Sequence, residues 1–281
     1  MTKVAFLNDT SLFSSHFGCQ LVGQVFREQI KRTGLDLVFS LPKTFELSEY
    51  KKQLDEVDLV VINGEGSIHH GRNKHLVDVA DKYPSVLLNC VFQENPIYPA
   101  LRKFLFISAR ESYSQKAILD QGAECHRVPD AIFASSFVRA FPGANQTGDM
   151  GITDNVVKEY AYKIGPFKKK ITGDFKAHNI TPAQYLYKLH SYRRICAGRF
   201  HAAVISACRG IPFSTWESNS WKTQAMLEDM GVPHLHFSTR EEAIQNCPET
   251  FDPKIGHFAD QAKIGIENMF DQVAQIAREQ C

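Results

Sequence analysis

The sequence predicts an α/β protein of two domains, each built around a parallel sheet. Strand-sized apolar runs alternate with helical patterns along most of the chain. The runs are apolar on both faces, as in strands that helices cover on both sides. A small, polar, turn-rich segment, 141–149, interrupts this alternation. The two predicted domains are therefore residues 1–140 and residues 150–281.

The elements of the first domain follow one another in regular order. The predicted strands cover 4–7, 35–39, 58–63, 86–90, 106–109 and 125–128. Apolar spacing and helix-boundary signals place helices over 21–30, 47–55, 74–82, 101–104 and 113–121. Because strand and helix alternate, this sheet is expected to be parallel and doubly wound.

The second domain repeats the pattern in fewer elements. Its predicted strands are 151–155, 194–197 and 213–216, and its helices 181–191, 202–208, 222–230 and about 258–278. Thr181 is expected to cap its helix, with Pro182 at the first helical position. The last helix carries one apolar face and is expected to bridge back to the first domain. Two Rossmann-like domains facing a cleft, with a linker and such a helix, suggest a GT-B-like architecture.

Composition narrows the class of protein. The chain has 281 residues, of which 43% are hydrophobic and 22% charged, as in a globular protein. The formal net charge is only +1, whereas proteins that bind duplex nucleic acid usually carry a strongly basic surface, so such a partner is not expected. No apolar run is long enough to span a bilayer, and the first residues lack a signal-peptide core, so a cytoplasmic enzyme is expected. The 7 cysteines are scattered and predict reduced thiols, with no metal site and no cofactor.

The segment 196–203 is the most informative stretch. An apolar strand ends at Gly198, and Arg199 and His201 open a helix there. Ligands of open α/β sheets bind at such strand ends, and a helix N-terminus favours anions. Arginine adds a forked donor and histidine a proton carrier. The simpler interpretation is a local salt bridge for Arg199 and a capping role for His201.

The two side chains face one ligand only under a condition on the backbone. Residues two apart on a regular helix point about 200° from each other. We therefore expect Gly198–Phe200 to be non-helical, with the helix beginning at His201 or just after it.

Further polar clusters follow the ends of other predicted strands. They are Asn8–Thr10 with His16-Phe17-Gly18, Gly64-Glu65-Gly66-Ser67, Arg110-Glu111-Ser112, Asp130 and Glu217–Lys222. Each cluster alone fits an ordinary turn or ion pair, whereas their common position indicates one cleft. The basic run Lys168-Lys169-Lys170 fits either a solvated loop or a polyanion contact.

Taken in order, these motifs resemble the polysaccharide pyruvyl transferase family over most of the chain. The matching pieces are Ile62-Asn63-Gly64-Glu65-Gly66, Arg110-Glu111-Ser112-Tyr113-Ser114, Gly122, Val128-Pro129-Asp130, Arg199-Phe200-His201-Ala202, Gly210-Ile211-Pro212 and Lys222. The Arg-x-His-Ala helix start, followed by Gly-x-Pro and a later lysine, is the most specific part.

The sequence also departs from the family pattern. His16-Phe17-Gly18-Cys19 stands where Asn-x-Gly-Asp is usual, so an acidic side chain is missing there. Gly64-Glu65-Gly66 replaces a run of three glycines, and Asp130 precedes Ala131 rather than proline. The chain is also short for the family. These departures bear on the acceptor and on the exact reaction.

The resemblance implies transfer of pyruvate from phosphoenolpyruvate to a sugar of a cell-surface polysaccharide or glycan precursor, forming a ketal. His201 is the expected acid/base and Arg199 the anion clamp. The residues expected at the donor are Arg110, Ser112, Arg199, Glu217 and Lys222. The residues expected at the acceptor are Asn8, Asp9, His16, Gly64, Glu65, Gly66 and Ser67. Peripheral association with a membrane-linked glycan is compatible with this function, and the oligomeric state stays open.

Two other functions fit the same residues. A GT-B-type glycosyltransferase would hold the phosphates of a nucleotide sugar with arginine and lysine, and Glu217 would then reach a ribose. A non-catalytic glycan-binding relative would keep the cleft without the chemistry. Donor binding, to phosphoenolpyruvate or to a nucleotide, discriminates between them.

Overall fold

The computed structural model describes residues 2–12, 15–66, 68–157 and 176–280. Contacts along the chain group them into two compact units. Unit 1 comprises Met1–Ser14, Val22–Ala131 and Ile264–Cys281, and unit 2 comprises Ser15–Leu21 and Ile132–Lys263. Ser67 and the run Lys168–Lys170 lie outside the described residues.

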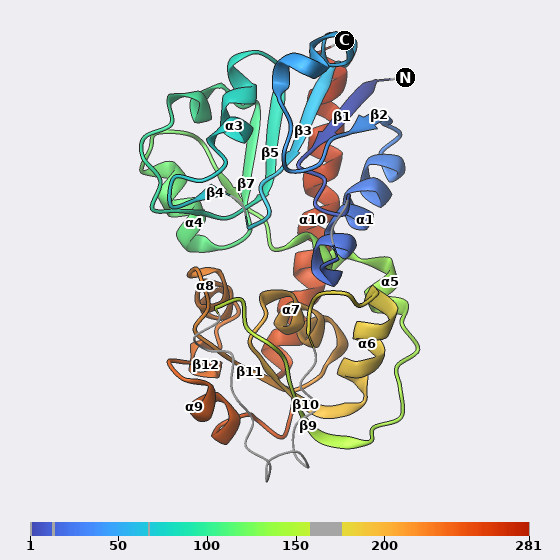
Figure 1. Ribbon diagram of the computed structural model, residues 1–281, viewed down its shortest axis with the longest axis vertical. Helices are drawn as coiled ribbons and strands as arrows, with labels where there is room; N and C mark the ends of the chain where they lie inside the picture. Colours follow the sequence, from blue (N-terminus) through green and yellow to red (C-terminus); the bar gives the residue numbers. More distant parts are fainter. Residues whose placement is uncertain (1, 13–14, 67, 158–175, 281) are drawn as a thin grey trace. The chain divides into compact units, whose positions relative to one another are not determined.

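Unit 1 is built on a parallel sheet of six strands in the order β2-β1-β3-β5-β7-β8 (Figure 1). The strands are β1 (Lys3–Leu7), β2 (Asp36–Ser40), β3 (Leu59–Asn63), β5 (Ser85–Cys90), β7 (Phe106–Ala109) and β8 (His126–Arg127). A separate pair, β4 (Ile68–His69) and β6 (Phe92–Gln93), is also parallel. The connecting helices are α1 (Phe17–Arg32), α2 (Lys51–Leu54), α3 (Lys74–Asp78) and α4 (Ser112–Leu119), with 3-10 turns at Leu47–Tyr50, Val79–Asp81 and Pro99–Lys103.

Unit 2 contains a parallel sheet of four strands in the order β12-β11-β10-β9. The strands are β9 (Gly148–Ile152), β10 (Tyr192–Ala197), β11 (Phe213–Trp216) and β12 (His236–Phe237). The helices are α5 (Ser136–Ala140), α6 (Pro182–His190), α7 (Phe200–Arg209), α8 (Lys222–Asp229) and α9 (Arg240–Gln245), with 3-10 turns at Ala131–Ala134 and Pro233–Leu235. The predicted α/β class with two parallel sheets is confirmed.

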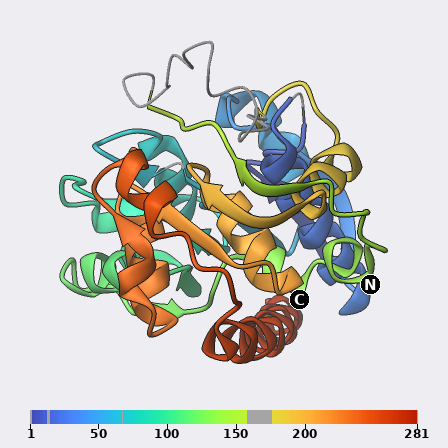
Figure 2. The same cartoon turned by 90° about the horizontal axis from the view of Figure 1, so that it is seen from below.

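Helix α10 (Pro253–Glu279) is the longest helix in the described part of the chain. Figure 1 shows it along its length and Figure 2 shows it nearly end-on. Its residues up to Lys263 belong to unit 2, and those from Ile264 onward belong to unit 1. No helix among the described residues has the length and apolar character needed to cross a membrane.

The linker prediction is wrong at one end. Gly148 and Asp149, assigned to the turn-rich segment, form the start of β9. This strand lies at the edge of its sheet and leaves both residues at least partly exposed, so its composition reads as a loop. Sequence reasoning also missed strand β12 and helix α9, which come later in unit 2. The domain ranges stay a prediction, and the compact units differ from them chiefly in Ser15–Leu21 and in the residues after Lys263.

Candidate functional site

In unit 2, two neighbouring parallel strands end in a pair of opposite charges. Asp154 follows β9 and Arg199 follows β10, and their side chains form an ion pair of 2.5 Å between Nη2 and Oδ2. The backbone N–H of Ala177 donates to the other oxygen of Asp154 at 3.1 Å. Asp154 therefore holds the Arg199 guanidinium at the carboxyl edge of the sheet. The local salt bridge considered for Arg199 is present.

The backbone conformations of Arg199 and His201 differ. Arg199 is extended, with φ −113° and ψ 132°, and α7 begins at the next residue, Phe200. The predicted non-helical stretch is thus one residue too long. The helical angle between positions two apart does not apply here, because Arg199 precedes the helix.

A cluster of imidazoles surrounds this strand end. The ring of His16 lies with its centre 6.0 Å from that of His201 and 4.9 Å from that of His178. Next to it, Phe17 stacks on Tyr185 at 3.5 Å, and the backbone N–H of Phe17 donates to the carbonyl of Ala177. These contacts lie within unit 2, to which Ser15–Leu21 belongs, whereas the sequence argument assigned His16 to the first domain.

His16 is held as a neutral ring. Its Nδ1 accepts a hydrogen bond of 3.1 Å from the N–H of Gly18, which fixes the tautomer with the proton on Nε2. Burial is the main cause that lowers the pKa of His16 to about 2, and electrostatic interactions with His201, Arg199, His178 and Lys222 act in the same direction. The positive charges of Arg199 and Lys222 create a positive potential around the ring.

Lys222 and Glu217 are the other two residues of unit 2 that are expected at the donor, and their side chains differ in their contacts. Lys222 starts α8, and its Nζ donates to Asn219 Oδ1 and Ser220 Oγ at 2.8 Å each. The backbone carbonyl of Glu217 accepts a 2.8 Å hydrogen bond from Asn155, whereas its side chain is exposed. Lys222 and Arg199 both act electrostatically on His16, and together they form the positive region of unit 2.

In unit 1, the carboxyl edge of the sheet carries a network of buried amides. Asn8, Asn63 and Asn89 follow or end the adjacent strands β1, β3 and β5 and are at most 2% exposed. Asn8 donates to the carbonyl of Asn63, and Asn89 donates to Asn63 Oδ1 at 3.4 Å. Asn8 and Asn89 have φ values of 54° and 57°, a region that asparagine tolerates better than most residues.

This network supports Glu65, which is 6% exposed. Thr10 Oγ1 donates to Glu65 Oε2 at 2.5 Å, and the Glu65 N–H donates to Asn63 Oδ1 at 3.0 Å. The turn needs glycine on both sides of Glu65. A Cβ at Gly64 would lie 2.7 Å from the Cys90 Cα, and Gly66 has a φ of 51°.

Arg110 lies close to this turn and forms a buried ion pair. Its Nη1 is 2.8 Å from Asp130 Oδ2, and the two side chains are 1% and 0% exposed. A Cβ at Gly66 would lie 3.9 Å from Arg110 Nη2. Ser112 is the first residue of α4, whose N-terminus is capped by the neighbouring Glu111. Burial is the main cause that raises the pKa of Glu111.

Asp9 is engaged within its own unit. Its carboxylate pairs with Arg27 and accepts a 3.0 Å hydrogen bond from the N–H of Ser11. The Asp9 side chain is 0% exposed. These contacts link the segment that follows β1 to helix α1.

Sequence reasoning missed several residues of the unit 2 site. Asp154 follows β9, but the predicted strand over 151–155 included it, so the strand-end rule did not select it. His178 and Tyr185 carry no such local signal. Among the described residues, no group of three or more His, Cys, Asp or Glu side chains is placed to hold a metal ion.

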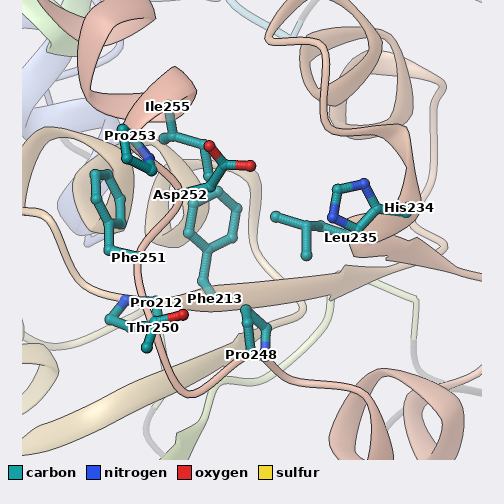
Figure 3. Close-up of a pocket in the computed structure, with 10 residues that line it drawn as sticks. All are labelled: Pro212, Phe213, His234, Leu235, Pro248, Thr250, Phe251, Asp252, Pro253 and Ile255. Atoms are coloured by element: carbon teal, nitrogen blue, oxygen red, sulfur yellow. The ribbon is translucent and has the colours of Figure 1, made fainter.

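A pocket of about 390 Å³ lies elsewhere in unit 2. Figure 3 shows the ten residues that line it, which come from the start of β11, the turn before β12, the segment leading into α10 and the first turn of α10. Phe213, Leu235 and Phe251 are among its apolar lining residues, and His234 and Asp252 add polar groups. None of the predicted site residues lines it. It lies toward the amino ends of the strands, whereas Arg199 follows a carboxyl end.

The protein has a GT-B-like α/β fold. The UDP-GlcNAc 2-epimerase of Methanocaldococcus jannaschii aligns with a TM-score of 0.57 at 11% identity, over 97% of this chain and 99% of that protein. A variant of the Thermobaculum terrenum O-GlcNAc transferase aligns with a TM-score of 0.53 at 10% identity, over 100% of this chain and 68% of that one. At these identities the likeness concerns the fold.

The family is established by sequence. The family model described as polysaccharide pyruvyl transferase matches residues 16–215, so this chain belongs to the polysaccharide pyruvyl transferase family. That membership places it among transferases. No curated protein sequence matches the chain.

Proposed function

We propose that this protein transfers pyruvate from phosphoenolpyruvate to two hydroxyl groups of a sugar, forming a cyclic ketal. The observation that carries the proposal is the positive region of unit 2. The guanidinium of Arg199 and the ammonium group of Lys222 both act on His16, whose ring lies beside those of His178 and His201. A small ligand with a phosphate and a carboxylate would complement this charge.

The chemistry needs one group that moves a proton and one that stabilises an anion. A proton is added to the methylene carbon of phosphoenolpyruvate, which becomes a methyl group and leaves C2 electrophilic. The first sugar hydroxyl adds to C2, phosphate leaves, and the second hydroxyl closes the ring. One hydroxyl proton balances the methyl group and the other leaves with phosphate. In this proposal His201 moves the proton and Arg199, held by Asp154, binds the anion.

The proposal assigns the sugar to polar groups of unit 1. Glu65 is a buried carboxylate held by Thr10, and the adjacent Gly66 leaves its backbone partly exposed without a side chain. Carboxylates and backbone groups of this kind suit the hydroxyls of a sugar. Arg110 is already paired with Asp130, so a donor contact from Arg110 would have to share that pair.

Calorimetric titration tests the donor directly. The protein is titrated with phosphoenolpyruvate, UDP-GlcNAc and UDP, and we expect binding of phosphoenolpyruvate alone. The protein is then incubated with phosphoenolpyruvate and a panel of sugar glycosides. Phosphate release and a product heavier by one pyruvate less one water are expected. Binding of the nucleotide sugar without phosphoenolpyruvate would replace this proposal with a glycosyl transfer.

A further inference from the structure

The first turn of α1 lies directly against the imidazole of His201. A Cβ atom added at Gly18 would lie 1.9 Å from His201 Nδ1 and 2.6 Å from its Cγ. Real Cβ atoms essentially never come within 3.0 Å of a heavy atom outside their own residue and its chain neighbours. Both residues belong to unit 2, and His201 is 7% exposed. The ring therefore occupies the space that any side chain at position 18 would fill.

The backbone itself does not require glycine here. The φ of Gly18 is outside the left-handed region, in contrast to that of Gly66. Alanine is also a better helix former than glycine, and Gly18 is the second residue of α1. Local conformation alone would thus favour alanine, and the imidazole is what excludes it.

Neighbouring rings restrict the imidazole on other sides. The ring centres of Phe200, His16 and Phe17 lie 5.3, 6.0 and 6.4 Å from that of His201. Two of these neighbours are themselves fixed, because His16 accepts from the Gly18 N–H and Phe17 stacks on Tyr185. An added methyl group at position 18 would have to displace His201 by more than an ångström.

We propose that Gly18 is a positioning residue for His201, since its missing side chain sets the place of the imidazole that moves the proton. Gly18 itself need not touch the substrate. The inference rests on the proposed function for the role of His201, whereas the placement of the ring can be tested without any substrate.

The first test uses NMR to detect the surroundings of the His201 ring directly. The imidazole resonances of histidine-labelled protein are recorded for the wild type, Gly18→Ala and Gly265→Ala, and His201→Ala identifies the His201 signals. Gly265 is the matched control, because a Cβ there meets nothing within 4 Å. We expect Gly18→Ala to shift the His201 signals and Gly265→Ala to leave them in place. Unchanged His201 signals in Gly18→Ala would overturn the inference.

The second test covers a variant that folds poorly. If Gly18→Ala lowers the Tm, His201→Ala in the same chain should restore it, because the removed ring leaves room for the new methyl group. A Tm that stays equally low in the double variant would contradict the proposed contact.

The third test uses the reaction. We expect Gly18→Ala to lower kcat by about 10²-fold, the cost of misplacing a catalytic group by about an ångström, with KM for phosphoenolpyruvate nearly unchanged. In the His201→Ala background the same change should cause no further loss. An equal loss in both backgrounds would show a structural role only. If the wild type transfers no pyruvate, the proposed function fails while the resonance test still decides the placement.

Discussion

The polar edges of the two sheets occupy the same position, after the carboxyl ends of parallel strands, but they differ in charge balance. In unit 1, Arg110 pairs with Asp130, Arg27 pairs with Asp9, and Thr10 donates to Glu65. In unit 2, the Arg199–Asp154 pair is joined by Lys222 and by the imidazoles around His16.

The difference shows how one sheet edge can serve two purposes. Buried charges that are matched one to one fix neighbouring strands to each other, and removing either partner leaves a costly unpaired charge. In the described part of unit 2, Lys222 adds a positive charge beside the Arg199–Asp154 pair, and positive charge at such an edge attracts an anion instead. The edge of unit 1 is thus expected to govern stability, and that of unit 2 donor binding and turnover.

The largest effect is expected at His201. Replacing it with alanine should lower turnover by about 10²–10⁴-fold, the usual contribution of a general acid/base. Phosphoenolpyruvate should still bind, because Arg199 and Lys222 remain. Phosphate release and calorimetry measure the two effects, and His126→Ala, at an exposed histidine of unit 1, is the control. Near-full activity would remove His201 from the mechanism and favour Glu65 or Glu217 as the acid.

The matched pair of unit 1 can be broken at Asp130. Asp130→Asn leaves the buried Arg110 charge without its carboxylate and should lower the free energy of unfolding by about 3–5 kcal/mol. Urea denaturation measures the change. If stability is retained while phosphoenolpyruvate binds more weakly, Arg110 belongs to the donor site, as the sequence predicts.

The edge of unit 2 can be weakened at Arg199, which pairs with Asp154. Arg199→Met should reduce the affinity for phosphoenolpyruvate by about 2–5 kcal/mol, the cost of losing one partner of a desolvated charge contact. Arg194→Met is the control, since Arg194 pairs with the exposed Asp149. Equal donor affinities for the two variants would contradict an anion site at Arg199.

The smallest effect concerns an imidazole of unit 2 away from this edge. Burial, and then the charge of Arg209, lower the pKa of His190 to about 4, and His190 Nε2 accepts from Arg209 Nε at 3.0 Å. The unfolded chain binds this proton near pH 6.5, so stability is complete above that pH and is lost as the pH falls toward 4.

His190→Gln keeps an acceptor for Arg209 but does not titrate. Between pH 7 and pH 5 we expect it to lose about 1 kcal/mol less stability than the wild type, a figure reduced for the partial exposure of His190. Urea denaturation at the two pH values gives the difference. An identical loss in both proteins would show that His190 is already charged or contributes nothing.

Most regular elements could be predicted because their signals are local. Apolar spacing located the central strands of both sheets, and Thr181 forms the predicted cap with Gln184 in a capping box. Helix α7 ends at Gly210, which has a φ of 66°. Where the local signal was polar, as at Gly148 on the edge strand β9, the prediction failed.

The sequence by itself determined that polar residues follow the ends of parallel strands, because hydrophobic periodicity and helix caps depend on neighbouring residues. Only the tertiary structure decided which of these residues meet. His16 lies beside His201, Asp154 holds Arg199, and Gly18 makes room for an imidazole far along the chain. Such pairings depend on the packing of distant segments, which no short stretch of sequence encodes.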